Sequence, residues 1–497
     1  MNKEKLTMIE LFSGIGAQKR GIDNTELFDL DVVATSDVDK EALVEYAAIH
    51  HGLTNEMIED YVDYPSREEM IEELVSRNIG MDFDKGVMYD WNKLLKKKTK
   101  TIEKYWLAMK LQNNLGDISR IEQLPVADCW FYSSPCQCFS LAGKQDGLDA
   151  TCNTCGSKYN PMNYDVEHRY ICPNCGSDDI KGTRSGLLLE VERLLIKAIE
   201  TNTAPKYLCL ENVKNLVGTQ FKPDFDAWVK RLEHLGYNTY WKVLNAKECA
   251  VPQNRERVFA FSIRKDIDTA KFTFPAPFDN GLRLKDILEP MVDEKYYINT
   301  ERANNLIQQL IDKGYLNAKS ILVRNQATEV TKPVDVANTL MARDWKGYGN
   351  QEMIAIVESQ NIDVAERIGG MFDGDTKHQA GSVWNTNGLA PTLDTMQGGL
   401  RQPCIVEDII KSNRVIYRIR KLTVREAFKL MGFEFADWDK CVEVGISNTA
   451  GYKAAGNSIV TNCISLIFEH LYKAQYNEWH ICTDENPTNF IQPQVVV

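Results

Sequence analysis

A doubly wound α/β fold with a mostly parallel sheet is the structure that the first part of the sequence predicts. Apolar segments of strand length alternate with amphipathic helical segments up to about residue 272. Several of the apolar segments run directly into glycine-rich or polar loops, where ligands bind in such sheets. After Phe272 the alternation stops, and the stretch FPAPFDNG predicts a domain boundary.

The elements follow in order from the N-terminus. LTMIELFSGIGAQKRGI predicts a buried strand, a tight glycine turn and a helix, and LDVVATS predicts a second strand. ADCWFYSS and PKYLCLEN predict strands followed by loops, and an amphipathic helix is expected over GLLLEVERLLIKAIE. NTYWKVLNAKE and RERVFAFSIRKD predict a pair of strands. Near the C-terminus RKLTVREAFKLMGF predicts a helix, and GYKAAGNSIV predicts a turn that leads into a long amphipathic helix.

The chain of 497 residues is long enough for two or three domains. We expect a large domain over residues 1–272, a small domain over 273–415, and a C-terminal segment over 416–497 that completes the small domain and returns to the large one. Two insertions are expected in the large domain, a helical one over about 40–115 and a cysteine-rich one over about 150–182.

Composition and charge limit the class of protein. The sequence contains no apolar run long enough to predict a membrane span, and its N-terminus lacks the pattern of a signal peptide. Thirteen cysteines without an export signal indicate reduced thiols or metal ligands, so we expect a cytoplasmic protein. The net charge of −12 by itself favours a small-molecule enzyme, because nucleic acid needs a basic surface. A local basic cleft on an acidic protein also meets that need.

The first glycine turn predicts a nucleoside site. Gly14 and Gly16 follow a strand and open a helix, which lets a ligand approach the backbone closely. Lys19 stands where the dinucleotide fingerprint has its third glycine, so a pyrophosphate is not expected. Asp37 ends the next strand at the spacing of a ribose-binding carboxylate. An ordinary turn with a surface aspartate is the alternative.

Three further motifs end or begin strands. Cys136 lies in a loop after a strand, where positive neighbours would lower its pKa and make it nucleophilic, although a lone cysteine is most often a buried apolar side chain. Glu211 places a carboxylate at another strand end. Gln253, Arg255 and Arg257 alternate, so in a strand they share one face. They would form surface ion pairs there or hold a phosphate or a base carbonyl.

Taken together, these motifs resemble the cytosine-C5 DNA methyltransferase family. The ordered set spans nearly the whole chain and leaves residues 275–415 uncovered. It consists of Phe12-Ser13-Gly14-Ile15-Gly16, Gly116-Asp117-Ile118, Pro135-Cys136-Gln137, Glu211-Asn212-Val213, Gln253-x-Arg255-x-Arg257, Arg420-Lys421-Leu422-Thr423-x-Arg425-Glu426 and Gly456-Asn457-Ser458. The resemblance implies a Rossmann-like class I methyltransferase domain, with the uncovered stretch as a target recognition domain that reads duplex DNA.

The resemblance also implies the roles of the residues. Cys136 would add to carbon 6 of a flipped cytosine, Glu211 would bind the ring N3 and amino group, and Arg257 would bind the carbonyl, with Arg255 close by. Gln137 and Ser140 would contact the DNA beside the target. The residues implied for S-adenosyl-L-methionine are Phe12, Gly14, Gly16, Asp37, Asp117, Ile118, Pro135, Asn457 and Ser458.

A cysteine-rich segment departs from the family's simplest pattern. Cys152-x-x-Cys155-Gly and Cys172-Pro-x-Cys175-Gly predict two knuckles that aim four thiolates at one structural Zn²⁺. A redox pair is the alternative, and His168 between the knuckles is not expected to be a ligand. This zinc ribbon follows the loop after Pro135-Cys136-Gln137, so we hypothesise that it anchors that loop and contacts DNA beside the target.

The sequence thus predicts a monomeric, bacterial or phage-type DNA methyltransferase that associates with the nucleoid when it acts. Three other functions stay open at this point. A relative that methylates transfer RNA shares the same core motifs, although the long 275–415 segment favours duplex DNA. A non-catalytic zinc-ribbon DNA-binding protein would not need Cys136, Glu211 and Arg257. A nicotinamide oxidoreductase lacks support because the third glycine is missing.

Overall fold

The structure is a computed structural model that describes the greater part of the chain. The described residues are 3–80, 94–135, 147–182, 184–298, 300–313, 323–324, 331–332, 365–371, 381–393, 395, 402–411 and 414–476. Over these residues no helix has the length and apolar character that a membrane crossing requires. The predicted site residues Cys136, Gln137 and Ser140 lie outside the described residues.

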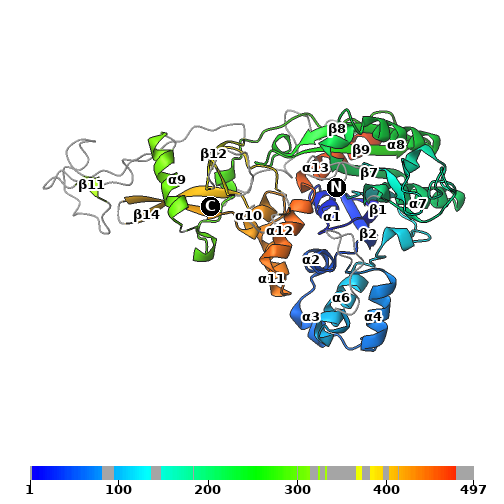
Figure 1. Cartoon of the computed structure of the whole chain (residues 1–497), viewed down its shortest axis with the longest axis horizontal. Helices are drawn as coiled ribbons and strands as arrows, with labels where there is room; N and C mark the ends of the chain where they lie inside the picture. Colours follow the sequence, from blue (N-terminus) through cyan, green and yellow to red (C-terminus); the bar gives the residue numbers. More distant parts are fainter. Residues whose placement is uncertain are drawn as a thin grey trace.

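A six-stranded sheet forms the centre of the large domain, in the order β2-β1-β3-β7-β9-β8 (Figure 1). Its strands are β1 (Glu4–Leu11), β2 (Phe28–Ser36), β3 (Cys129–Tyr132), β7 (Tyr207–Val213), β8 (Tyr237–Asn245) and β9 (Glu256–Arg264). The strands β2, β1, β3 and β7 are parallel neighbours, and β9 is antiparallel to both β7 and β8. The predicted α/β fold with a mostly parallel sheet is confirmed, including the strand pair at its edge.

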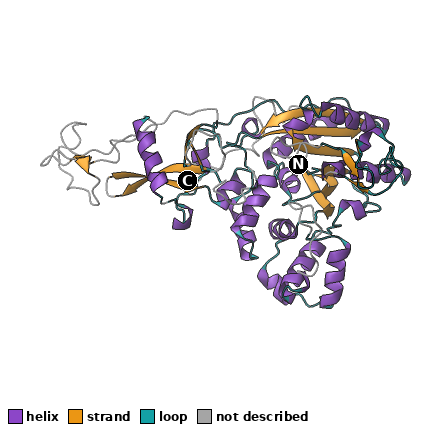
Figure 2. Ribbon diagram, viewed as in Figure 1, coloured by secondary structure: helices purple, strands orange, loops and turns teal. Residues whose placement is uncertain are grey.

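Helices cover both faces of this sheet. Successive strand residues point to opposite faces, so neighbouring residues enter different buried clusters. Met8 and Phe131 belong to one buried cluster, whereas Ile9 and Trp130 belong to the other. The first cluster includes residues of α1 (Ala17–Asp23), α2 (Lys40–His51) and α13 (Thr461–Tyr476). The second includes residues of α7 (Leu188–Glu200) and α8 (Lys222–His234). Figure 2 shows the resulting helix–sheet–helix layers.

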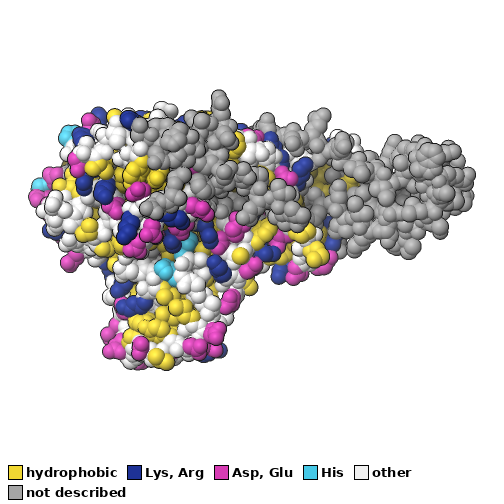
Figure 3. Space-filling model, turned by 180° about the vertical axis from the view of Figure 1, so that it is seen from behind, with side chains coloured by type: hydrophobic (Ala, Val, Ile, Leu, Met, Phe, Trp, Pro, Cys, Tyr) yellow, Lys and Arg dark blue, Asp and Glu magenta, His cyan; other side chains and the backbone are white. Residues whose placement is uncertain are grey.

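A helical lobe extends from the first face of the sheet. It is formed by α3 (Asn55–Asp60), α4 (Arg67–Ser76) and α6 (Thr99–Leu111), which pack beside α2 (Figure 1). Hydrophobic side chains gather on this lobe between acidic and basic ones (Figure 3). An aromatic cluster of Tyr61, Tyr64 and Trp106 holds its helices together.

A smaller sheet lies apart from the large one, in the order β12-β13-β14-β15. Its strands are β12 (Arg367–Gly370), β13 (Ser382–Trp384), β14 (Cys404–Lys411) and β15 (Arg414–Lys421), and β10 (Val323–Arg324) pairs separately with β11 (Thr331–Lys332). Helix α9 (Glu301–Asp312) packs on this sheet, and Leu306 and Leu310 enter its core with Val383 and Ile419. A third, even smaller sheet has the order β5-β4-β6, with β4 (Ala150–Cys152), β5 (Lys158–Tyr159) and β6 (Ile180–Lys181).

The C-terminal helices join the two larger sheets. They are α10 (Val424–Lys429), α11 (Phe435–Glu443), α12 (Asn448–Asn457) and α13. The turn expected over GYKAAGNSIV is largely wrong, since residues up to Asn457 belong to α12 and only 458–460 turn. Gly451 is there for packing, because a Cβ at this position would lie 2.3 Å from the Trp438 ring. Helix α13 returns to the large sheet, where Phe468 meets Phe28.

A buried ion pair fixes the connection between β15 and α10. Arg420 donates to both carboxylate oxygens of Glu426 at 2.8 Å, and both side chains are 0% exposed. The same carboxylate accepts from the backbone N–H groups of Thr423 and Glu289, which are 2.8 and 2.9 Å away. The Glu426 carboxylate therefore accepts hydrogen bonds from β15, from the start of α10 and from the segment around Glu289.

Replacement of Arg420 by Met should lower the free energy of unfolding by about 3–5 kcal/mol, because it leaves the Glu426 carboxylate buried without its cation. Chemical denaturation followed by far-UV circular dichroism measures this change. Lys100→Ala, which removes an exposed ion pair with Glu59, is the control and should leave unfolding unchanged. Equal stability of Arg420→Met and the wild type would contradict the importance of this pair.

Candidate active site

The predicted site residues gather at one edge of the large sheet. Parallel strands end at the same edge, so the segments after β1, β2, β3 and β7 meet there. The first three segments carry Phe12 to Gly16, Asp37, and Ser133 to Pro135, and Glu211 lies near the end of β7 itself. Because β9 is antiparallel, it begins at this edge, and its Arg257 pairs with Val213 of β7. The sheet topology therefore brings residues far apart in the sequence together.

The glycine turn is tied to the end of β2. The backbone N–H of Gly14 donates to Oδ2 of Asp37 at 2.9 Å, and the N–H of Phe12 donates to the carbonyl of Ser36 at 2.7 Å. Gly14 has a φ of +51° and open space where a Cβ would stand. Gly16 has a φ of +74°, and a Cβ there would lie 2.4 Å from Nε2 of His50. One glycine leaves room for a ligand, and the other permits close packing against α2.

Asp37 is a partly buried carboxylate with a raised pKa. Burial and the neighbouring charge of Asp39 raise its pKa to about 6, against hydrogen bonds from the backbone that lower it. Asp39 itself pairs with Lys453 of α12 at 2.9 Å, which connects this loop to the helix that ends in Asn457. The Asp37 carboxylate, expected from the sequence to bind a ribose, accepts from the backbone N–H groups of Gly14 and Asp39.

A polar group beneath the glycine turn was missed by the sequence analysis. Glu10 of β1 is fully buried, and it accepts from the Tyr46 hydroxyl at 2.5 Å and from the Lys19 N–H at 2.9 Å. Burial raises its pKa to about 7. His50, one helical turn after Tyr46, lies 3.0 Å from the carbonyl of Ile15. A charged residue inside the apolar run MIELF was the signal for this cluster.

Asp117 and Ile118 lie in a tight turn before β3. Asn78 donates to Oδ2 of Asp117 at 2.7 Å, and Oδ1 accepts from the N–H of Ser119 at 3.0 Å. Gly116 has a φ of +77°, and a Cβ there would lie 2.1 Å from the carbonyl oxygen of Arg77. The Ile118 side chain is buried in the core, 2% exposed. Its backbone carbonyl accepts from the guanidinium of Arg193 at 3.2 Å.

Glu211 is the centre of a second polar cluster. Its side chain is 8% exposed, and its Oε1 lies 3.3 Å from Nε of Arg257. The Ser133 hydroxyl donates to Oε2 of Glu211 and, at 3.0 Å, to its backbone carbonyl. Asn212 donates to the carbonyl of Ser134 at 3.1 Å, one residue before Pro135. The structure thus places Glu211 and Arg257 together beside the segment that leads to Cys136, and it adds Ser133.

Arg255 is placed differently from Arg257. Its buried guanidinium donates to the backbone carbonyls of Leu393, Gly456 and Ser458, at 2.8, 3.0 and 2.8 Å. The expectation that Gln253, Arg255 and Arg257 share one strand face is wrong, because β9 begins only at Glu256. Gln253 instead donates to the carbonyl of Leu430 at 2.9 Å. In this structure Arg255 therefore holds the turn that carries Asn457 and Ser458.

The four cysteines of the predicted ribbon lie together. Cys152, Cys155, Cys172 and Cys175 place their sulfur atoms within 4.8 Å of one another. Two of these separations, Cys152 to Cys175 and Cys155 to Cys172, are 3.6 Å. A tetrahedral zinc with bonds of about 2.3 Å spaces its sulfurs by about 3.8 Å. The cluster therefore has the donor set and nearly the size of a structural zinc site.

The two knuckles have the same backbone geometry. Gly156 donates to the carbonyl of Cys152 at 2.9 Å, and Gly176 donates to that of Cys172 at 2.8 Å. The glycines have φ values of +74° and +72°, which favour glycine after the second cysteine of each pair. Between the knuckles, Nδ1 of His168 lies 2.7 Å from Oδ1 of Asp165.

Comparison with known proteins gives consistent results. The model of the C-5 cytosine-specific DNA methylase family matches residues 174–473. The Type II methyltransferase M2.ScrFI of Lactococcus lactis subsp. cremoris is 30% identical, over 95% of this chain and 100% of its own length. The Orphan methyltransferase M.SPBetaI of Bacillus phage SPbeta is 26% identical, over 95% and 99%.

Solved structures are similar at lower identity. The Entamoeba histolytica methyltransferase EhMeth has a TM-score of 0.47 and 13% identity, and 95% of this chain and 99% of that chain are covered. The S. pombe Dnmt2 methyltransferase has a TM-score of 0.46 and 14% identity, with 95% and 100% covered. The family match over more than half of the chain, together with the full-length relatives, decides the classification: this chain belongs to the C-5 cytosine-specific DNA methylase family.

Proposed function

We propose that the chain methylates carbon 5 of cytosine in a specific sequence of duplex DNA. The observation that carries the proposal is the buried Glu211 carboxylate, paired with Arg257 and Ser133 at the strand edge beside Pro135. Relatives named Type II methyltransferases, in bacteria, favour DNA over the alternative of transfer RNA. Cys136, Glu211 and Arg257 together favour an enzyme over a non-catalytic binding protein.

The chemistry begins with the thiolate of Cys136, which forms a bond to carbon 6 of the flipped cytosine. Glu211 hydrogen-bonds the ring N3 and the exocyclic amino group, which stabilises the charge that develops as sulfur adds. Arg257 binds the base carbonyl oxygen. Bound S-adenosyl-L-methionine supplies a methyl group as an electrophilic sulfonium. After carbon 5 is methylated, its proton passes to water, and the Cys136–carbon 6 bond breaks to restore the double bond.

The cofactor site proposed for this chemistry lies beside the cluster around Glu211. Asp37 binds the ribose hydroxyls, and Phe12 stacks beside the adenine. Gly14 leaves room for the methionine part, and Gly16, which packs closely against α2, flanks it. The adenine, at its other edge, is bound by the turn of Asp117 and Ile118, and Pro135, Asn457 and Ser458 complete the methionine end. Arg255 acts as a positioning residue here, because it holds the carbonyls of Gly456 and Ser458.

The small domain over residues 273–415 is proposed as the part that recognises the DNA sequence. Its described sheet and α9 are joined to the large domain through the segment around Gln253. In that segment the backbone N–H of Asn254 donates to the carbonyl of Ala390 at 2.8 Å. Gln137 and Ser140 are proposed to contact the DNA beside the flipped base. A single chain contains every residue of this proposal, so we propose a monomer.

Incubation with labelled methyl donor should place label on duplex DNA, whereas transfer RNA should stay unlabelled. Cys136→Ala should abolish labelling, because no other thiol of the proposal adds to carbon 6. DNA that carries 5-fluorocytosine should trap the wild type covalently, since the fluorine cannot leave as the proton does, and gel electrophoresis detects the adduct. Label on RNA alone, or full labelling by Cys136→Ala, would contradict the proposal.

Affinity for S-adenosyl-L-methionine should depend on pH through Asp37. With a pKa of about 6, the carboxyl takes up a proton below that pH and binds the ribose hydroxyls less well as a neutral acid. Calorimetry should show an affinity that is constant above about pH 7 and falls by up to about tenfold per unit below pH 6. Asp37→Asn should bind weakly with no step at this pH. The same step in Asp37→Asn would assign the titration to another group.

The family assignment does not explain the cysteine ribbon, and we propose that its four cysteines hold one structural Zn²⁺. The purified protein should contain about one zinc per chain by atomic absorption, because four thiolates close a tetrahedral site. Cys172→Ser should lose this zinc. Cys441→Ala, which changes a buried cysteine of α11, should keep it. A wild-type protein without zinc after metal-replete expression would contradict this part of the proposal.

A further inference from the structure

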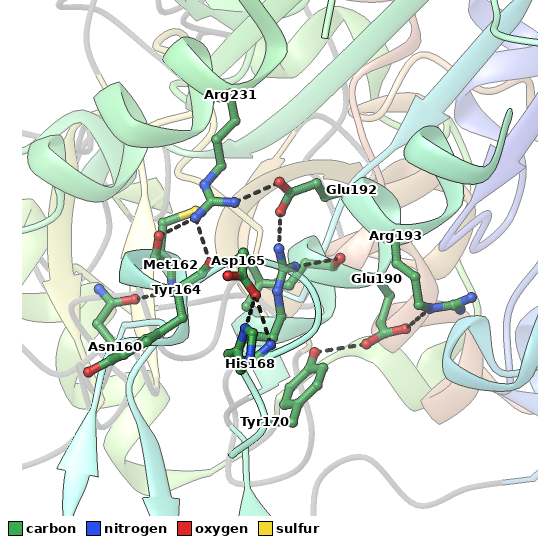
Figure 4. A network of polar contacts seen from close by, with 12 residues as sticks. Asn160, Met162, Tyr164, Asp165, His168, Tyr170, Glu190, Glu192, Arg193 and Arg231 are labelled. Carbon is green, nitrogen blue, oxygen red and sulfur yellow. Dashed lines mark hydrogen bonds and ion pairs between the residues drawn. The ribbon is translucent and has the colours of Figure 1, made fainter. Parts of the chain in front are cut away.

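The cysteine ribbon, residues 147–182, is docked on the large domain through side chains of α7 and α8 (Figure 4). From α8, Asp224 accepts from Asn160 at 2.8 Å, and Arg231 donates to the carbonyl of Tyr164 at 2.9 Å. From α7, Glu190 accepts from the Tyr170 hydroxyl at 2.8 Å. The ribbon is thus bound to the helices that cover one face of the catalytic sheet.

A buried carboxylate on α7 is the main docking point. Oε2 of Glu192 lies 2.6 Å from the guanidinium of Arg169 in the ribbon, and Oε1 lies 2.7 Å from that of Arg231 on α8. The side chains of Glu192 and Arg169 are only 4% and 1% exposed. A buried charge is costly without its partner, so the pair of Arg169 with Glu192 opposes separation of the ribbon from α7, while Arg231 holds the same carboxylate from α8.

The metal cluster and the docking point are connected within the ribbon. Arg169 stands three residues before the ligand Cys172, and its carbonyl accepts from the Tyr159 hydroxyl at 2.9 Å. Tyr159 lies in β5, which follows the first knuckle and pairs with β4. The fold around the four sulfurs therefore sets the position from which Arg169 reaches Glu192.

A second chain of contacts runs from the ribbon to the turn of the cofactor site. Glu190 binds Tyr170 of the ribbon, and it also accepts from Nε of Arg193 at 2.8 Å. The other end of the Arg193 guanidinium donates to the carbonyls of Ile121 and Ile118, at 2.8 and 3.2 Å. Ile118 follows Asp117 directly, in the turn that is proposed to bind the adenine.

The surface of the ribbon does not suit DNA. Its exposed carboxylates outnumber its exposed lysines, and the one arginine of the ribbon is buried against Glu192. The exposed acids are Asp149, Asp165, Glu167, Asp178 and Asp179, and the exposed lysines are Lys158 and Lys181. Phosphate backbones are bound by positive surfaces, so these charges disfavour the DNA contact expected from the sequence.

We propose that the zinc-binding ribbon is a buttress of the S-adenosyl-L-methionine site, with Tyr170 and Glu192 as its positioning residues, and that it does not bind DNA. This inference rests on the proposed zinc and cofactor sites. Zinc folds the ribbon, Glu192 docks it, and the contacts of Tyr170, Glu190 and Arg193 support the turn of Asp117 and Ile118. Loss of the ribbon's order loosens that turn and weakens binding of the adenosyl group.

Tyr170→Phe in the full chain tests the inference, because it removes one hydroxyl and leaves the cysteines intact. Calorimetry with S-adenosylhomocysteine should show binding about 2- to 10-fold weaker, with unchanged zinc content. The matched control is Asp165→Asn, which removes the exposed pair with His168 on the same ribbon and should bind as the wild type does. Unchanged affinity in Tyr170→Phe, or an equal loss in Asp165→Asn, would overturn the buttress.

Glu192→Gln gives an independent measurement. It should keep zinc but make residues 147–182 more sensitive to limited proteolysis, since Arg169 and Arg231 lose their shared anion. Resistance equal to that of the wild type would contradict the docking role. For DNA, Lys158→Ala with Lys181→Ala should leave the salt dependence of binding unchanged, and a slope reduced by about 1 per lysine would show phosphate contacts.

The possible results distinguish failure of this inference from failure of the proposed zinc site or the proposed cofactor site. Wild-type protein without zinc overturns the metal site and the buttress, whereas methylation would remain. Wild-type protein that does not bind S-adenosylhomocysteine overturns the cofactor site. Zinc and cofactor binding that are both intact, with no effect of Tyr170→Phe, overturn the buttress alone.

Discussion

The buried carboxylate of Glu211 is the group on which the geometry of the candidate active site depends. A carboxylate on a side chain that is 8% exposed needs hydrogen-bond donors close by, and the two that it has come from neighbouring segments. Ser133 supplies one from the end of the parallel neighbour β3. Arg257 supplies the other from β9, which must run antiparallel for its first residues to meet the last residues of β7. The single antiparallel neighbour in an otherwise parallel arrangement is thus what completes the site.

The segment before β9 joins the two larger domains by backbone bonds. The N–H of Ala390 donates to the carbonyl of Pro252 at 2.6 Å, and the N–H of Asn254 donates to the carbonyl of Ala390 at 2.8 Å. The Gln253 side chain donates to the carbonyl of Leu430. Arg255 then binds carbonyls on both sides, from Leu393 and from the turn after α12. Because these contacts are to backbone atoms, they fix the position of chain segments whatever side chains those segments carry. The proposed recognition domain can therefore be held against the large domain without dependence on the side chains of the bonded segments.

Much of the fold could be predicted from the sequence because strand and helix periods are local. The strands from β1 to β9 in the large sheet, the helix α7 and the two knuckles follow from apolar alternation, amphipathic spacing and cysteine spacing. Tertiary partners could not be predicted in this way. Gln253 and Arg255 alternate with Arg257, yet they precede the strand, since their partners lie in the small domain and the C-terminal helices. The glycines of GYKAAGN indicated a turn, whereas Gly451 lies in a helix because Trp438 leaves no room for a Cβ.

The candidate site residues likewise divide into those that a local sequence pattern indicates and those that only tertiary contacts reveal. Asp37 and Glu211 were predicted as site residues because each follows or ends an apolar run, whereas Ser133, one of two serines before a proline, was not predicted. The pair of Glu10 and Tyr46 connects a strand with a helix, and nothing in either local pattern names the other residue. The docking of the ribbon was likewise hidden, because Arg169, Glu192 and Arg231 come from three separate elements that only the fold brings together.

The size of the ribbon explains why metal and docking belong together. Its strands have two or three residues each, and a segment of this length buries too little apolar surface to fold alone. Zinc binding is a source of folding free energy for such segments. Polar docking contacts, however, need a fixed backbone, since the guanidinium of Arg169 meets the Glu192 carboxylate only from one position. The proposed zinc would thus make the docking geometry possible, and the docking contacts hold this small segment on α7 and α8.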